Sequence, residues 1–185
     1  MKSEIIVECL NDSKANLILK VDCKEKLSSK AYIGKNGITD NKVEGDGKTP
    51  IGTFKLGKIF GFGNKEKVKA EFNIDNYTQI TPTMYWVDDS NSTHYNKLVD
   101  TKEIKKDWKS AEHLCDFPIE YEYGIEIKTN PNNIPNKGSA IFLHCSNNKP
   151  TAGCVAIPKD DIIKLLRFIK GETTIKIVQG DIWKV

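Results

Sequence analysis

Only one segment of this 185-residue chain has the full pattern of a helix, with start and stop signals and one apolar side, which restricts the fold to a mostly β architecture. This segment, residues 158–170, begins with a proline, has two aspartates in its first turn and ends before a glycine. Most of the remaining chain consists of short apolar or alternating runs separated by turn residues, as expected for β-strands. Strands are predicted over residues 5–10, 15–21, 30–33, 53–59, 120–128, 140–143, 155–157 and 174–178, with a short helix over 110–115 and a last strand over 181–185.

A histidine and a cysteine lie at the two ends of one short connection between expected strands, at His144 and Cys154. Removal of the thiol proton by a nearby imidazole is the usual way to activate a cysteine nucleophile. A thiol activated in this way should react with alkylating agents faster than the other four cysteines at neutral pH. Gly153 allows a close backbone approach, and the Gly153 and Cys154 amides are candidate donors to an oxyanion. On these residues alone, a buried cysteine and a structural histidine are the alternatives.

The length and composition of the chain exclude several classes of protein. The chain fits one domain over residues 1–185 and is long enough to form a core without disulfides or metal. The net charge is +3 with acids and bases interspersed, so we expect no nucleic-acid binding. Five cysteines without a CxxC pair, and only three histidines, argue against a zinc site, and we expect no metal and no cofactor.

The N-terminal residues and the hydropathy pattern bear on location. Residues 1–9 lack the apolar core of a signal peptide, and no apolar run reaches the length of a membrane span. The sequence therefore leaves two locations open, a cytoplasmic protein or one whose leader is not part of this sequence.

Two separated motifs make the chain resemble the L,D-transpeptidase catalytic domain, also called the YkuD domain. The first is Gly-Lys-Thr-Pro-Ile-Gly-Thr-Phe at 47–54, similar to the T-P-x-G-x-F entry of that family. The second is His144 followed by Thr-Ala-Gly-Cys at 151–154, similar to the family's histidine, spacer and [S/T]-x-G-C. With the segments 85–89 and 138–144, the resemblance covers residues 30–178 and leaves residues 1–29 as additional N-terminal strands.

The resemblance implies a mostly β fold of the YkuD type, a β-sandwich or mixed sheet with one main helix after the catalytic cysteine. The commoner family pattern has a second histidine where this chain has Ala152, and Arg or Asn where it has Ala156. These departures indicate an atypical T-A-G-C branch. If the missing arginine holds a substrate carboxylate, Lys149, Lys159 and Arg167 are the candidates to replace it.

The resemblance also implies a reaction on peptidoglycan stem peptides. Cys154 is the expected nucleophile on an L,D-peptide bond, His144 its base, and Gly153 part of the oxyanion hole. The amine of a second stem peptide then resolves the thioester into a cross-link, so the expected partners are donor and acceptor stems. A carbapenem is the expected covalent inhibitor, and the cell envelope the expected location. Water as the acceptor gives an L,D-carboxypeptidase instead, and Ala152 and Ala156 leave a non-catalytic wall-peptide-binding module as the third alternative.

Several further residues have expected roles around this pair. Thr151 either contacts substrate near the nucleophile or caps the turn. Asp89, with its neighbour Asp88, is a candidate for binding the amine of the stem, and Lys149 for binding a carboxylate. Cys145 should point to the opposite face of its strand and pack in the core, because side chains alternate along a strand. A backbone carbonyl near Cys145 or Ser146, or the Ser146 hydroxyl, is expected to orient the imidazole.

Overall fold

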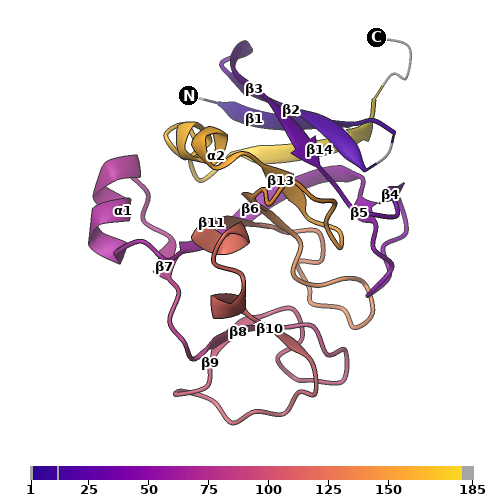
Figure 1. Ribbon diagram of the computed structural model, residues 1–185, viewed down its shortest axis with the longest axis vertical. Helices are drawn as coiled ribbons and strands as arrows, with labels where there is room; N and C mark the ends of the chain where they lie inside the picture. The colour runs from indigo at the N-terminus through magenta and orange to yellow at the C-terminus, as the bar shows by residue number, and fades with distance from the viewer. Residues whose placement is uncertain (1, 12, 181–185) are drawn as a thin grey trace.

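The computed structural model describes residues 2–11 and 13–180, and strands dominate it (Figure 1). The strands are β1 (Ser3–Cys9), β2 (Lys14–Val21), β3 (Lys24–Tyr32), β4 (Ile38–Thr39), β5 (Thr49–Pro50), β6 (Gly52–Gly61), β7 (Tyr77–Gln79), β8 (Met84–Val87), β9 (Leu98–Asp100), β10 (Ala111–His113), β11 (Tyr123–Ile127), β12 (Phe142–Cys145), β13 (Val155–Ile157) and β14 (Thr174–Gln179). The helices are α1 (Lys65–Phe72) and α2 (Lys159–Leu166), with 3₁₀ turns at Leu114–Asp116 and Glu120–Glu122.

The main sheet closes into an eight-stranded barrel. Its strands follow the order β11-β12-β13-β3-β2-β1-β14-β6, and pairing of β6 with β11 closes the circle. The sheet is mixed, because β1 with β14, and β12 with β13, pair in parallel while most other pairs are antiparallel. Closure leaves no unpaired edge within the barrel, an arrangement that limits edge-to-edge association. The expected mostly β fold with a mixed sheet is confirmed.

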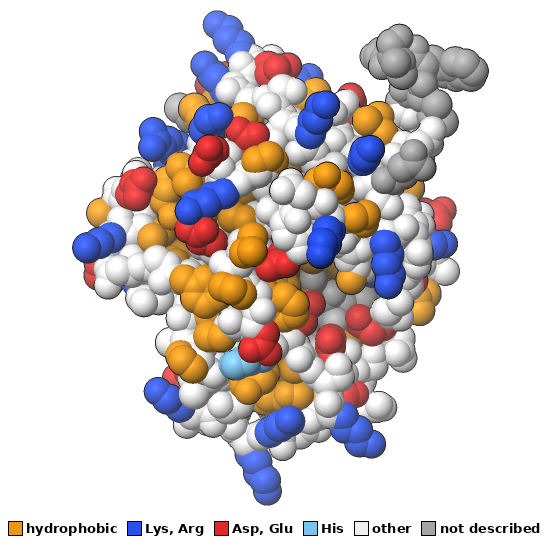
Figure 2. All heavy atoms as spheres, viewed as in Figure 1, with side chains coloured by type: hydrophobic (Ala, Val, Ile, Leu, Met, Phe, Trp, Pro, Cys, Tyr) orange, Lys and Arg blue, Asp and Glu red, His pale blue; other side chains and the backbone are white. Residues whose placement is uncertain are grey.

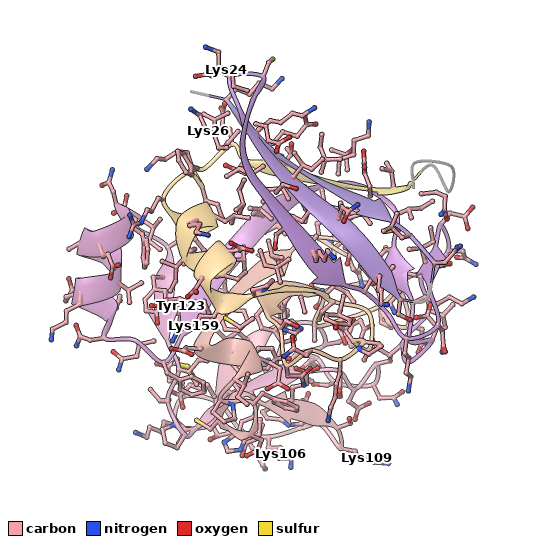
Figure 3. The ribbon with its side chains drawn as sticks, turned by 45° about the horizontal axis from the view of Figure 1, so that its top comes forward. Lys24, Lys26, Lys106, Lys109, Tyr123 and Lys159 are labelled. Carbon is pink, nitrogen blue, oxygen red and sulfur yellow. The ribbon has the colours of Figure 1, made fainter. Side chains whose placement is uncertain are left out.

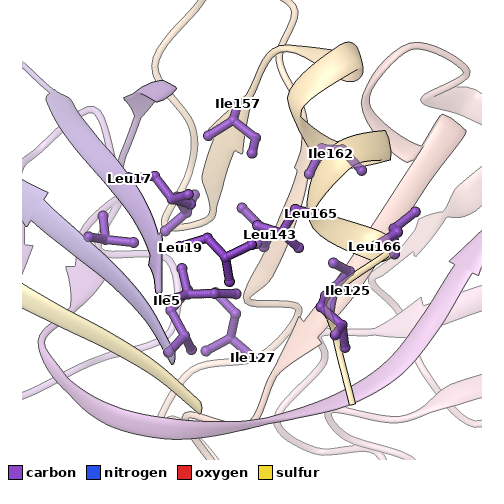
Figure 4. Packing of buried hydrophobic residues seen from close by; sticks show 14 of the residues in the cluster. Ile5, Leu17, Leu19, Ile125, Ile127, Leu143, Ile157, Ile162, Leu165 and Leu166 are labelled. Carbon is purple, nitrogen blue, oxygen red and sulfur yellow. The ribbon is translucent and has the colours of Figure 1, made fainter. Parts of the chain in front are cut away.

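The barrel encloses one apolar core, to which α2 contributes one face (Figure 4). Along β1, buried and half-buried residues alternate, as expected for a strand with one face inside. Ile162, Leu165 and Leu166 of α2 are fully buried in the same cluster. The helix expected over 158–170 is present, but it ends at Leu166.

Helix α1 was not predicted from the sequence. The Asn64 side chain caps it by accepting a hydrogen bond from the Lys67 amide at 3.1 Å, and Asn73 ends it in the left-handed conformation. Val68 and Phe72, four residues apart, are its buried residues. Within residues 2–11 and 13–180, no helix has the length and apolarity that crossing a membrane requires.

Three other predictions meet different outcomes. The short helix predicted over 110–115 is wrong, because Ala111–His113 forms strand β10, which pairs with β8 and is followed by a 3₁₀ turn. Pairing with a neighbouring strand here outweighs local helical preference. The N-terminal strands β1, β2 and β3 lie within the barrel rather than beside it. The strand predicted over 181–185 lies outside the described residues.

A small second sheet, in the order β10-β8-β9, lies below the barrel in Figure 1. Trp86 of β8 packs against Phe60 of β6 and Phe142 of β12, with ring centroids 6.1 and 4.7 Å away. This second apolar cluster also includes Cys154 and is distinct from the barrel core. The small sheet and the outer face of the barrel therefore meet at the segment that carries the expected nucleophile.

Candidate active site

The parallel pair β12 and β13 brings the two ends of the reactive segment to one face of the sheet. His144 lies opposite Ala156 in the register, and Cys154 directly precedes β13. Because side chains alternate, Phe142, His144 and Cys154 point to the outer face. Cys145 points the other way and is buried in the barrel core, as predicted, where its pKa is raised to about 11 by burial.

The imidazole of His144 is held in one orientation by the backbone. Its Nδ1 lies 2.8 Å from the Cys145 carbonyl, which accepts the hydrogen bond, so the lone pair of the neutral ring is on Nε2. The Tyr121 ring packs edge-on against it, with the ring centroids 5.7 Å apart. Burial lowers the pKa of His144, which keeps the ring neutral at neutral pH. A neutral imidazole with a free Nε2 is suited to accept a proton.

The Cys154 thiol is buried and held by backbone groups. Its Sγ accepts a hydrogen bond from the Phe142 amide at 3.3 Å and donates to the Ala140 carbonyl at 3.2 Å. Ala140 has a φ of 52°, a sparsely populated conformation for a non-glycine residue. Among the residues that the structure describes, no hydrogen bond joins this thiol to His144.

Burial raises the pKa of Cys154 to about 12, and the nearby Glu112 charge acts in the same direction. The Phe142 amide and the Lys42 charge oppose this rise without overcoming it. The activated thiol expected from the Cys/His pair is therefore wrong for the free protein, in which both groups are neutral. A substrate must change this environment before the sulfur can attack.

The turn that precedes the nucleophile is built by Thr151 and Gly153. The Thr151 hydroxyl donates to the Cys154 carbonyl at 2.7 Å and accepts from the Gly153 amide at 3.1 Å. The structure thus gives Thr151 the turn-capping role. Gly153 has a φ of 149°, and a Cβ there would lie 2.9 Å from the Lys48 carbonyl oxygen, so a side chain does not fit. The Gly153 amide, which is expected in the oxyanion hole, donates its hydrogen bond to the Thr151 hydroxyl in this state.

The Thr-Pro motif, far earlier in the chain, is hydrogen-bonded to this same turn. Thr49 is fully buried, and its hydroxyl accepts a hydrogen bond from the Gly34 amide at 2.8 Å and donates to the Cys154 carbonyl at 3.4 Å. Thr151 also contacts the segment that contains Gly34, since the Thr151 carbonyl accepts a hydrogen bond from the Lys35 amide at 2.8 Å. The two separated sequence motifs are therefore parts of one structural unit around the nucleophile.

Lys42 is the cation that the structure places beside the nucleophile, and the sequence did not indicate it. Its side chain is only 10% exposed and forms an ion pair with Asp46. Its Nζ also donates to the Lys48 carbonyl at 2.9 Å and lies 3.2 Å from where a Cβ of Gly153 would be. The charge of Lys42 lowers the pKa of Cys154. Lys42 lies only five residues before the Gly-Lys-Thr-Pro motif, but nothing in its local pattern distinguishes it from other lysines.

The other expected binding residues have different surroundings. Both carboxylate oxygens of Asp89 accept hydrogen bonds, one from the Lys109 amide at 2.8 Å and one from the Asn91 amide at 2.9 Å. These hydrogen bonds lower the pKa of Asp89. Lys149 is exposed, and its side chain has no contact with Cys154 among the described interactions. Lys159 forms an ion pair with Glu122 and lies beside Tyr123 on the surface (Figure 3).

Alkylation of the cysteines is expected to follow exposure rather than position in the motif. Cys23 is exposed, whereas Cys154 is only 7% exposed and has a raised pKa. At pH 7, iodoacetamide should therefore modify Cys23 at least about 100-fold faster than Cys154, because the thiolate is the reactive form. Peptide mass spectrometry over a time course measures both rates, and protein unfolded in urea provides the control. Faster labelling of Cys154 would show that its thiol is already activated without substrate.

Comparison with known proteins identifies a family that this chain matches. The model of the L,D-transpeptidase catalytic domain (YkuD) matches residues 6–177. Among solved structures, the helical cell shape determining protein Pgp2 from Campylobacter jejuni is similar over 97% of this chain, with 14% identity and a TM-score of 0.50. An L,D-transpeptidase (Yku) from Stackebrandtia nassauensis is similar over 97% of this chain, with 12% identity and a TM-score of 0.45. The comparison with curated proteins found no match.

The share of each protein that is covered limits what these similarities show. This chain spans 49% of the Pgp2 structure and 57% of the Stackebrandtia structure, and the similarity to Pgp2, at 14% identity, shows the fold alone. The family match is broader, because it begins at residue 6, includes both motifs and ends in β14. It also includes the strands before residue 30 that the resemblance in sequence left out. The chain therefore belongs to the YkuD family of L,D-transpeptidase catalytic domains.

Proposed function

We propose that this chain is a cysteine acyltransferase that cross-links peptidoglycan stem peptides as an L,D-transpeptidase of the cell envelope. The main support is the placement of His144 and Cys154 on one face of the parallel pair β12 and β13, with Nε2 of the imidazole left free by the Cys145 carbonyl. A base oriented by a third group next to a nucleophile is the arrangement that covalent acyl transfer requires.

In the proposed reaction, Sγ of Cys154 attacks the carbonyl carbon of the L-centre in an L,D-peptide bond. The thiol proton, which points to the Ala140 carbonyl in the free protein, passes to Nε2 of His144. His144 then donates this proton to the leaving D-amino acid, and a thioester remains on Cys154. The neutral amine of the acceptor stem attacks the thioester carbonyl, His144 takes the proton that this amine loses, and the C–S bond breaks as the amide cross-link forms. His144 then returns the proton to the Cys154 thiolate.

The oxyanion in this mechanism is stabilised by the backbone. The Cys154 amide has no hydrogen-bond partner among residues 2–11 and 13–180, so it is available to a substrate oxygen. The Gly153 amide becomes a second donor only if the Thr151 hydroxyl releases it. One donor is therefore ready in the free protein, and the second depends on a small movement of the turn.

Removal of the Lys42 charge tests whether this lysine assists the thiolate. We expect Lys42→Met to raise the pKa of Cys154 further and to slow its acylation by about 10- to 100-fold, since one nearby charge is lost. The measurement is the rate of Cys154 acylation against pH, whose alkaline shift a merely structural role would not produce. Lys164→Met, at an exposed lysine paired with Asp161, is the matched control. An unchanged pH profile in Lys42→Met would contradict this role.

One observation favours a second candidate function, a wall-peptide-binding module. The thiol is not hydrogen-bonded to His144 among the described residues, and its pKa is raised. A chain that binds stems without reacting would tolerate such a thiol.

Incubation with a tetrapeptide stem, followed by mass spectrometry of the products, separates these functions. A cross-linked dimer supports transpeptidation, and a tripeptide alone supports an L,D-carboxypeptidase that uses water as the acceptor. If the wild type forms neither product, and binds the stem no differently from Cys154→Ala, the proposed enzyme is wrong and the binding module stands.

A further inference from the structure

Three carboxylates gather beside the nucleophile without a cation of their own. Glu112 of β10 accepts a hydrogen bond from the Tyr121 hydroxyl, and Glu44 accepts one from the Tyr95 hydroxyl. Burial, together with the charges of Asp88 and Glu44, raises the pKa of Glu112 to about 7, so both of these carboxylates lie close enough to act on Glu112. Like charges in a half-buried site oppose folding unless something compensates for them.

Within this acidic cluster, Glu44, Asp88 and Glu112, Glu112 is the member that acts on Cys154. The Glu112 charge raises the pKa of the Cys154 thiol. Tyr121, which donates to Glu112, packs in the same apolar cluster as Cys154 and contacts the His144 ring. Figure 2 shows acidic side chains close together around a shallow recess in the middle of one face of the molecule.

Two buried polar atoms in this region have unused hydrogen-bonding capacity. Within residues 2–11 and 13–180, the Oδ1 atom of Asp88 and the Oγ atom of Ser139 are both buried without a hydrogen bond of normal geometry, although Ser139 lies close enough to the Tyr95 hydroxyl to lower its pKa. Ser139 is only 7% exposed, lies beside the Tyr95 hydroxyl and directly precedes Ala140, whose carbonyl holds the thiol. Buried polar atoms are nearly always paired, and leaving them unpaired destabilises the folded state.

No cation of the described chain neutralises the acidic cluster. The ion pairs among residues 2–11 and 13–180 involve other acids: Asp46 with Lys42, Asp116 with His113, Glu122 with Lys159, and Asp161 with Lys164. Lys42, the cation that acts on Cys154, is already engaged by Asp46 and the Lys48 carbonyl. The cluster is thus negatively charged, partly desolvated and supplied with acceptors.

We propose that Glu44, Asp88 and Glu112, together with the Ser139 hydroxyl, form a subsite for the primary ammonium group on the diamino-acid side chain of the donor peptide. An ammonium has three donors and no acceptor, and the cluster offers several acceptors and no free cation. An amine that attacks a thioester must be neutral, whereas carboxylates stabilise its protonated form. The cluster therefore suits an amine that is bound, not one that reacts. This inference rests on the proposed function, because it assigns a substrate group to the same site.

The test measures binding to Cys154→Ala, which cannot turn over. Two tetrapeptide stems are compared by calorimetry, one with a free side-chain amine and one with that amine acetylated. We expect acetylation to weaken binding by about 10- to 100-fold, the effect of losing charge-assisted hydrogen bonds. Equal affinities for the two peptides, or binding of neither, would overturn the subsite.

Matched variants of Cys154→Ala locate the effect. Adding Asp88→Asn should bring the affinity ratio of the two peptides close to one, without weakening binding of the acetylated peptide. Adding Asp160→Asn, at an exposed acid on α2, should leave the ratio unchanged. If Asp88→Asn weakens both peptides equally, the subsite is wrong.

Two further measurements keep the result interpretable. The melting temperature of Asp88→Asn should be no lower than that of its parent, because the substitution removes a repelling charge. Ser139→Ala is a second variant, which should also lower the ratio of the affinities for the free and the acetylated peptide. Failure of the wild type to form any product would overturn the proposed transpeptidase while the amine discrimination stays measurable. A failure of the proposed transpeptidase activity can therefore be distinguished from a failure of the proposed amine subsite.

Discussion

Cys154→Ala is expected to lower turnover of a stem tetrapeptide by at least about 10⁴-fold, because the covalent intermediate can no longer form. Cys154 is the one cysteine of the five that is buried in the apolar cluster with Phe142 and Tyr121, whereas Cys115 only packs against this cluster. The variant should still fold, since the thiol is held only by the Ala140 carbonyl and the Phe142 amide. Product analysis by mass spectrometry measures the loss, and circular dichroism confirms the fold.

The control for this prediction is Cys23→Ser, at an exposed thiol far along the chain from both motifs, which should keep full activity. A carbapenem should add its mass to Cys154 in the wild type and to no cysteine in Cys154→Ala. Appearance of that mass on Cys145 would contradict the assignment, as would turnover by Cys154→Ala near the wild-type rate.

His144→Gln is expected to slow acylation by about 10²- to 10⁴-fold, the usual contribution of a general base. Glutamine cannot take the thiol proton, although its amide can keep a hydrogen bond to the Cys145 carbonyl. His94→Gln is the matched control, because His94 lies in a loop between β8 and β9, where its ring packs edge-on against the Trp108 ring with the centroids 6.0 Å apart. A smaller loss in His144→Gln than in His94→Gln would exclude His144 as the base.

The pH dependence of the wild-type rate tests the same assignment. Burial lowers the pKa of His144 below its ordinary 6.5, so the imidazole stays neutral to lower pH than a free histidine does. The acid limb of the acylation rate should therefore fall only as the pH drops through this lowered value, below 6.5. This limb should disappear in His144→Gln, because no base remains to be protonated. An acid limb centred above 6.5 would contradict the buried imidazole.

Local sequence patterns predict most barrel strands and α2, because β1 and β2 alternate with one buried face and α2 buries one face at helical spacing. Strands β12 and β13 are buried on both faces and are indicated only as short apolar runs, and most of β3 lies before the predicted residues 30–33. Helix α1 was missed because its apolar positions are few. Its remaining signals, the Asn64 cap and the spacing of Val68 and Phe72, are short and surrounded by lysines. Residues 110–115 were assigned to a helix because nothing local indicates their partner, which is β8, more than 20 residues earlier in the chain.

The sequence by itself determined the mostly β class, the pair His144 and Cys154, and the family to which both motifs point. These properties depend on periodicity and on residue types at short spacing, which the chain carries locally. Only the tertiary structure decided how the site is completed. It brought Lys42, Glu112 and Tyr121 to the thiol from three distant segments and buried the thiol so that its pKa rises. Burial and charge proximity are properties of the packed molecule, so no pattern along the chain reports them.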